Sequence, residues 1–148
     1  MALLVTGRIL LDTNVFIDYL RSGRHEAWVW GGRESRIRFL SAVVLMELRV
    51  GADTLRRRRA VDRLKAAFPP GRVVPPTAAL FERAGALFRE LYSPRPAIHD
   101  RLGPLNDLLI ALTAWRIGAA VVTGNSDEFH RIAGHLPGLV VVEPVERS

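Results

Sequence analysis

Five acidic side chains of this sequence are candidates for chemistry. Asp12, Glu47 and Asp107 stand among apolar residues, and Asp127 and Glu128 lie in the polar segment 123–129. A carboxylate in apolar surroundings is costly unless a cation meets it. Carboxylates that share one cleft repel each other, and hard oxygen ligands in a chain without cysteine select magnesium or manganese rather than zinc. Together these acids predict a site for Mg²⁺ or Mn²⁺, whose chemistry suits hydrolysis of a phosphodiester.

Each acid taken alone also has a simpler interpretation. Asp12 directly follows Ile9, Leu10 and Leu11, where an acid is often a turn residue. Asp107 could cap a helix, and Glu47 could face solvent from an amphipathic helix. Asp127 and Glu128 could be solvated loop residues. The metal site therefore depends on the acids converging in space, which requires particular elements to bring them together.

Short apolar runs that alternate with helical patterns predict an α/β domain with a mainly parallel sheet. The predicted strands are 8–11, 37–40, 72–74, 120–122 and 139–142, and the predicted helices are 43–50, 55–68, 78–91 and 105–117. Ligands of such a sheet bind beyond the carboxyl ends of its strands, where Asp12 and a polar loop at 123–129 are expected. Asp107 is expected in the first turn of its helix, where the helix dipole favours an anion.

Length and composition narrow the class of protein. The 148 residues, 49% of them hydrophobic, predict one globular domain over 1–148. No apolar run approaches the roughly 20 residues that span a bilayer, so we expect a cytoplasmic protein with no membrane partner. The net charge of +6 comes almost wholly from arginine, since Lys65 is the only lysine, and it favours a polyanionic or acidic partner.

Four motifs, in this order and spacing, resemble PIN-domain ribonucleases of the VapC toxin type over about the whole chain. They are Asp12-Thr13-Asn14, the segment 41–48 that ends in Glu47-Leu48, Asn106-Asp107 with the small and apolar residues after it, and Val122-Thr123-x-Asn125 ending in Phe129. The resemblance implies a three-layer α/β/α sandwich and a Mg²⁺- or Mn²⁺-dependent endoribonuclease that cleaves RNA. It also implies a cognate antitoxin protein that occludes the cleft, and a homodimer.

The resemblance further implies a role for individual residues. By motif position, Asp12 and Asp107 look like the metal ligands, and Glu47 looks like a third member of the acidic set. The supporting polar groups would be Thr13, Asn14 and Thr123.

One position departs from the common pattern of the family. Many relatives place an acid where Asn125 stands, and here the acids come later, at Asp127 and Glu128. The fourth acidic residue is therefore open. Asn125 ranks first as a metal-proximal or water-positioning group, with Asp127 behind it.

Two other functions remain open from the sequence. A phosphatase with an aspartyl nucleophile would also carry an acid after a buried strand, but its second acid is replaced here by Asn14. A catalytically incomplete PIN-like domain could bind RNA or an antitoxin without cutting. The arginine run 56–59 is either a solvated helix face, an RNA-backbone contact or a dock for an acidic antitoxin segment.

Overall fold

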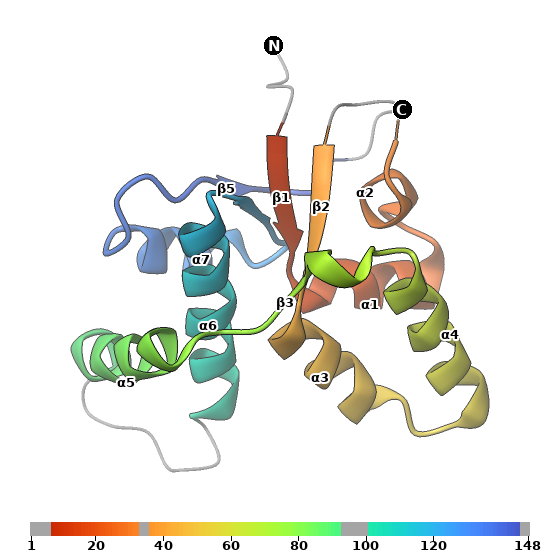
Figure 1. The fold of residues 1–148 in the computed structure, drawn as a ribbon, viewed down its shortest axis with the longest axis horizontal. Coiled ribbons are helices and arrows are strands. Elements are labelled where there is room, and N and C mark those ends of the chain that lie inside the picture. Colours follow the sequence, from red (N-terminus) through yellow and green to blue (C-terminus); the bar gives the residue numbers. More distant parts are fainter. Residues whose placement is uncertain (1–6, 33–35, 93–100, 146–148) are drawn as a thin grey trace.

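A computed structural model describes residues 7–32, 36–92 and 101–145. Five strands form one sheet: β1 (Gly7–Leu11), β2 (Arg36–Ser41), β3 (Val73–Val74), β4 (Ala120–Val122) and β5 (Val141–Val142). The strand order is β3-β2-β1-β4-β5, and every pairing is parallel. The strand that precedes Asp12 therefore lies at the centre of the sheet (Figure 1).

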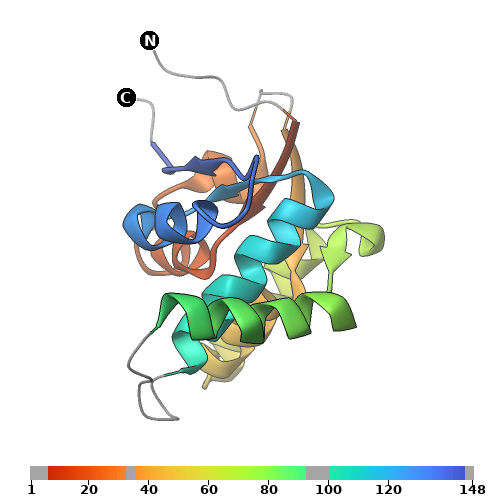
Figure 2. The ribbon, with the colours of Figure 1, turned by 90° about the vertical axis from the view of Figure 1, so that its left-hand side faces the viewer.

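Helices cover the sheet on both sides. They are α1 (Thr13–Ser22), α2 (Glu26–Trp30), α3 (Ala42–Gly51), α4 (Leu55–Ala66), α5 (Ala78–Leu91), α6 (Leu102–Ile117) and α7 (Ser126–Ala133), with a 3-10 turn η1 (Pro70–Arg72) before β3. Figure 1 shows α1 and α4 on one side of β1 and α6 and α7 on the other, and Figure 2 shows α5 lying along α6. This arrangement confirms the predicted α/β/α fold with a parallel sheet.

The central strand and α6 form the middle of the core. Ile9, Leu10 and Leu11 have no exposed surface, as expected for a parallel strand that is covered on both faces. Burying one such side chain stabilises the fold by about 2 kcal/mol. Helix α6 is buried continuously from Leu108 to Ala114, between the sheet, α3 and α5. A helix that is apolar on all sides is packed inside the core. Because its surroundings hold this helix in place, they also fix the position of the acid near its N-terminal end.

The predicted strands and all four predicted helices are present, but three helices were missed. Helix α1 begins immediately after β1, with Asp12 as its N-cap. No turn residues therefore separate the apolar run of the strand from the periodic pattern of the helix. Helix α2 has only five residues, too few for a periodic signal. The segment 123–129 was predicted to be a polar loop, whereas Ser126 already begins α7, whose Phe129 and Ile132 are buried.

The start of α6 was also placed wrongly. The helix begins at Leu102 rather than at residue 105, because the backbone N–H of Leu105 already donates to the carbonyl of Arg101. Pro104 lies within the first turn, where its missing N–H costs nothing. Asp107 therefore lies in the second turn, and the helix-dipole argument made for it does not hold, since that effect is confined to the first turn.

Within the described part of the chain, no helix has the length and the apolar character needed to cross a membrane.

Candidate active site

The carboxylate of Asp12 is held in place at the carboxyl end of the central strand. Its backbone N–H donates to the carbonyl of Val122 at 2.8 Å, which joins the ends of β1 and β4. The residue is 4% exposed. Its Oδ1 accepts from the backbone N–H of Thr13 at 2.8 Å, and its Oδ2 accepts from Thr123 Oγ1 at 2.8 Å and from Asn14 Nδ2 at 3.1 Å. Both oxygens are thus oriented by donors from two elements.

Asn14 and Thr123 are themselves fixed by the loop after β4. Asn14 Oδ1 accepts from the backbone N–H of Gly124 at 3.1 Å, and its Nδ2 lies 3.4 Å from Thr123 Oγ1. Thr123 is fully buried, and its hydroxyl oxygen also accepts from the backbone N–H of Asn125 at 2.9 Å. The structure therefore brings the three predicted supporting residues, Thr13, Asn14 and Thr123, to the same carboxylate.

Burial dominates the protonation of Asp12. It raises the pKa of this carboxyl to about 6 from an ordinary value of 3.8, against the opposing effect of the hydrogen bonds from Thr123 and Thr13. The nearby charge of Glu47 makes a smaller contribution to this rise in the pKa. A buried carboxylate whose negative charge is disfavoured in this way is a site where a cation would be bound favourably.

Glu47 comes to the same place from α3. The Ser41 hydroxyl accepts from the backbone N–H groups of Val43 and Val44, so that α3 begins directly at the end of β2. Two turns later, Glu47 Oε1 accepts a hydrogen bond of 2.7 Å from Thr13 Oγ1. Thr13 thus contacts two acids, through its backbone N–H on Asp12 and through its hydroxyl on Glu47.

Asp107 completes the group from α6. Burial, together with the charges of Asp12, Glu47 and Glu128, raises its pKa to about 7. Three acids, from the N-cap of α1, from α3 and from α7, therefore act on one carboxyl of α6. The convergence that the sequence motifs predict for Asp12, Glu47 and Asp107 is present in the fold.

Glu128, rather than Asp127, is the acid of α7 that faces this group. The hydroxyl of Tyr92 donates to Glu128 Oε1, and Arg131 lies 4.0 Å from Oε2. Burial and the hydrogen bond to Glu128 raise the pKa of Tyr92. Asp127 and Asn125 are exposed, and neither side chain makes a hydrogen bond or ion pair with the described residues. Asn125 meets the site only through its backbone N–H.

The sequence contained a signal that favours Glu128. Residues 126–133 form an amphipathic helix in which Phe129 and Ile132 point inward. Glu128 stands four residues before Ile132 and shares its face, whereas Asp127 stands four residues before the half-exposed Arg131. Treating this segment as a loop removed the periodicity that separates the two acids.

The acidic group fits a hard divalent cation by its chemistry. Its donors are carboxylate oxygens, and the raised pKa values of Asp12 and Asp107 show that negative charge there lacks compensation. Among residues 7–32, 36–92 and 101–145, no three acidic or histidine side chains stand in ready metal-binding positions. Asp12 and Asp107, the two carboxyls of the group with raised pKa values, are the candidate ligands.

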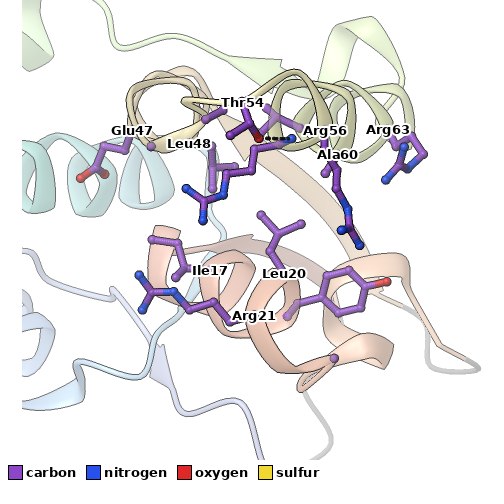
Figure 3. Close-up of a pocket in the computed structure, with 15 residues that line it drawn as sticks. Ile17, Leu20, Arg21, Glu47, Leu48, Thr54, Arg56, Ala60 and Arg63 are labelled. Atoms are coloured by element: carbon purple, nitrogen blue, oxygen red, sulfur yellow. Dashed lines mark hydrogen bonds between the residues drawn. The ribbon is translucent and has the colours of Figure 1, made fainter.

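A pocket of about 640 Å³ opens beside Glu47, between α1, α3 and α4 (Figure 3). Ile17 and Leu20 of α1 point toward α4 across this pocket, and Leu48 of α3 lies between α1 and α4. The site is therefore continuous with a groove on the surface.

Comparison with known proteins gives matches at the level of family and fold. A family model for the PIN domain matches residues 9–135. The DNA-bound VapBC structure from Salmonella typhimurium is 24% identical over 95% of this chain and 100% of that chain, with a TM-score of 0.67. VapBC-1 from nontypeable Haemophilus influenzae is 22% identical over 94% and 99%, with a TM-score of 0.66.

A toxin-antitoxin complex from Klebsiella pneumoniae is 28% identical over 94% of this chain and 99% of that chain, with a TM-score of 0.63. No curated protein matches the sequence. The family match spans β1 through α7, and so includes every acid of the candidate site. The family expected from the four motifs is confirmed: this chain belongs to the PIN-domain family.

Proposed function

We propose that this protein is a Mg²⁺- or Mn²⁺-dependent endoribonuclease that hydrolyses RNA phosphodiester bonds, and that it is the toxin of a toxin-antitoxin pair. The observation that carries the proposal is the convergence of Asp12, Glu47 and Glu128 on Asp107, beyond the carboxyl end of the central strand. Membership of the PIN family and the likeness to VapBC complexes support the toxin assignment.

The chain's own residues would divide the work as follows. Asp12 and Asp107 would hold the divalent cation, and Thr123 and Asn14 would keep Asp12 in its binding orientation. A bound cation would supply an activated water and would offset charge on the phosphoryl oxygens. Thr13 holds one oxygen of Glu47, so the other oxygen is available to orient or deprotonate a water.

The fourth acidic position is assigned to Glu128. Its charge acts on Asp107, and the Tyr92 hydroxyl fixes one of its oxygens. Asn125 keeps a role through its backbone N–H, which positions the Thr123 hydroxyl. A substitution of the Asn125 side chain should therefore affect catalysis less than a substitution of Glu128.

The remaining assignments concern the binding partners, the oligomeric state and the cellular location of the protein. A net charge of +6 suits a polyanionic RNA substrate. The VapBC neighbours are complexes, which supports a cognate antitoxin protein for this chain as well. We further propose a homodimer in the cytoplasm. The antitoxin assignment has a direct consequence. The free protein should be toxic to its host, and its complex with the antitoxin should be harmless.

The test is cleavage of defined RNAs by the purified protein. Single-stranded and structured RNAs are incubated with Mg²⁺, with Mn²⁺ or with EDTA, using the native chain and the variants Asp12→Asn and Asp107→Asn. Asp62→Asn, on exposed α4, is the matched control. Cleavage is expected only with metal and only in the native chain and the control. Cleavage that survives EDTA or either active-site substitution would refute the mechanism.

A second function is favoured by one observation. Because no ready metal-binding group of three exists among the described residues, the domain could bind RNA or an antitoxin without cutting it. RNA binding with normal affinity, but no cleavage at any Mg²⁺ or Mn²⁺ concentration, would favour this alternative.

A further inference from the structure

The pocket beside Glu47 has an apolar floor and a basic rim, and we call it the arginine groove. Its floor contains Ile17, Leu20 and Leu48, and its rim contains Arg21, Arg56, Arg57 and Arg63. Arg21 comes from α1, whereas Arg56 and Arg63 come from α4 on the opposite side (Figure 3). Figure 3 also shows Glu47 at one end of this row of side chains and Arg63 at the other. The groove thus leads away from the acidic site.

Three of the four rim arginines, Arg21, Arg56 and Arg63, form no ion pair or side-chain hydrogen bond with the described residues. The fourth, Arg57, is neutralised by Asp53 at 2.6 Å, and Arg49, outside the groove lining, is neutralised by Asp62 at 2.7 Å. Three uncompensated positive charges around one concave surface repel each other, and an anionic ligand would relieve that repulsion.

The position of the groove beside the acidic site indicates which kind of anion it would bind. Four carboxylates repel the phosphates of an approaching polyanion, and a cation at the cleavage site offsets only part of that charge. Binding energy for the substrate must come from positive groups nearby. The arginine groove opens beside Glu47 and so carries such groups at the border of the acidic site.

The dimensions agree with a nucleic-acid strand. Arg56 and Arg63 are seven residues apart on α4, which is about 10 Å at a rise of 1.5 Å per residue. The axial spacing of phosphates along one strand of a DNA duplex is about 3.4 Å, so two arginines this far apart can contact different phosphates of one strand. The bases of such a strand would rest on the apolar floor, while its phosphates would meet the rim.

We propose that the arginine groove binds the single-stranded RNA flank on one side of the cleaved bond, with Arg21, Arg56 and Arg63 contacting its phosphates. The inference rests on the proposed RNA cleavage, which the groove extends by a substrate-binding path. The groove makes the enzyme prefer long single strands over short ones, because only a strand that extends beyond the cleavage site reaches all three arginines.

The experiment compares two variants that lose the same charge in different places. The groove variant carries Arg21→Gln, Arg56→Gln and Arg63→Gln. The control variant carries Arg24→Gln, Arg58→Gln and Arg59→Gln, all of them exposed and outside the groove lining. Binding of a fluorescein-labelled 12-nucleotide single-stranded RNA is measured by anisotropy in EDTA, which stops cleavage. Circular dichroism melting establishes that both variants are folded.

The groove variant should bind about 100-fold more weakly at 0.1 M salt, since each phosphate contact on a single strand contributes roughly a factor of 5 there. The slope of log K against log salt should fall by about 2, at about 0.7 per contact. In Mg²⁺, the groove variant should raise KM for the 12-mer far more than it lowers kcat. The control variant should change affinity by no more than a few-fold.

Three outcomes would overturn the inference: equal loss of affinity in the two variants, unchanged affinity in the groove variant, or groove-dependent binding of a glutamate-rich helical peptide with RNA binding unaffected. The last outcome would make the groove a protein-docking site. If the native chain cleaves no RNA but its RNA affinity still depends on the groove, the proposed function fails while the binding path stands. If it cleaves normally and the groove variant matches the control, only the binding path fails.

Discussion

Replacing Asp12 with asparagine should stabilise the metal-free protein while abolishing cleavage. Raising the pKa of Asp12 from 3.8 to about 6 disfavours its charged form by about 3 kcal/mol, because a tenfold change in proton affinity is about 1.4 kcal/mol. The folded state binds this proton more tightly than the unfolded state does. The stability of the native chain therefore falls as pH rises from about 4 to about 6, and the full penalty remains above that range.

Asparagine removes the charge but loses one hydrogen bond. Its Oδ1 can still accept from the backbone N–H of Thr13, and the Thr123 hydroxyl can rotate to accept from the new amide. The Nδ2 group of Asn14 would then face another donor, at a cost of about 1 kcal/mol. The net gain at pH 8 is about 2 kcal/mol, or about 4 to 8 °C in melting temperature for a chain of this size. At pH 4 the gain should vanish.

The assay is thermal unfolding of the native chain and the variant in EDTA, at several pH values between 4 and 8. Asp62→Asn serves as the control, since Asp62 is exposed and its pair with Arg49 is a surface pair that contributes at most about 1 kcal/mol. A melting temperature of the Asp12 variant well below that of the native chain at pH 8 would show that the carboxylate is structural. A difference that does not change with pH would refute the assignment of the penalty to its charge.

The other predictions concern metal, the fourth acid and the supporting groups. Mg²⁺ or Mn²⁺ should raise the melting temperature of the native chain at pH 8 but not that of Asp107→Asn, since the charge on Asp107 is disfavoured until a cation meets it; an equal rise in both would exclude Asp107 as a ligand. Glu128→Gln should lower kcat at least tenfold, whereas exposed Asp127→Asn should leave it within about twofold, in an RNA-cleavage assay; the reverse order would return the fourth acidic role to Asp127. Thr123→Val should destabilise the fold by about 1 to 3 kcal/mol in urea, because it leaves the Asn125 N–H without its acceptor and removes a donor from Asp12; an unchanged midpoint would mean that water replaces the hydroxyl. Tyr92→Phe should keep its ring packed against Phe88 while lowering kcat in the RNA-cleavage assay, because Glu128, in the fourth acidic role, loses its donor; an unchanged kcat would count against a role for Tyr92.

The sequence by itself determined the fold class and the three acids that carry the motifs. Apolar runs such as Ile9 to Leu11 are local patterns, and a parallel sheet brings the ends of its strands to one edge whatever the loops do. This geometry explains why Asp12 and the segment after β4 could be placed at one edge without coordinates. The grouping of Glu47 and Asp107 with Asp12, and the supporting roles of Thr13, Asn14 and Thr123, came from the resemblance of the motifs to the PIN family.

Only the tertiary structure decided which further side chains face this edge. The choice between Asp127 and Glu128 depends on the rotation of α7, which the burial of Phe129 and Ile132 sets. The second turn of α6, the Tyr92 hydroxyl on Glu128 and the groove between α1 and α4 are likewise consequences of packing between elements distant in sequence. Local propensity carries no information about such contacts, because each is chosen by the shape of a partner surface that does not exist until the chain has folded.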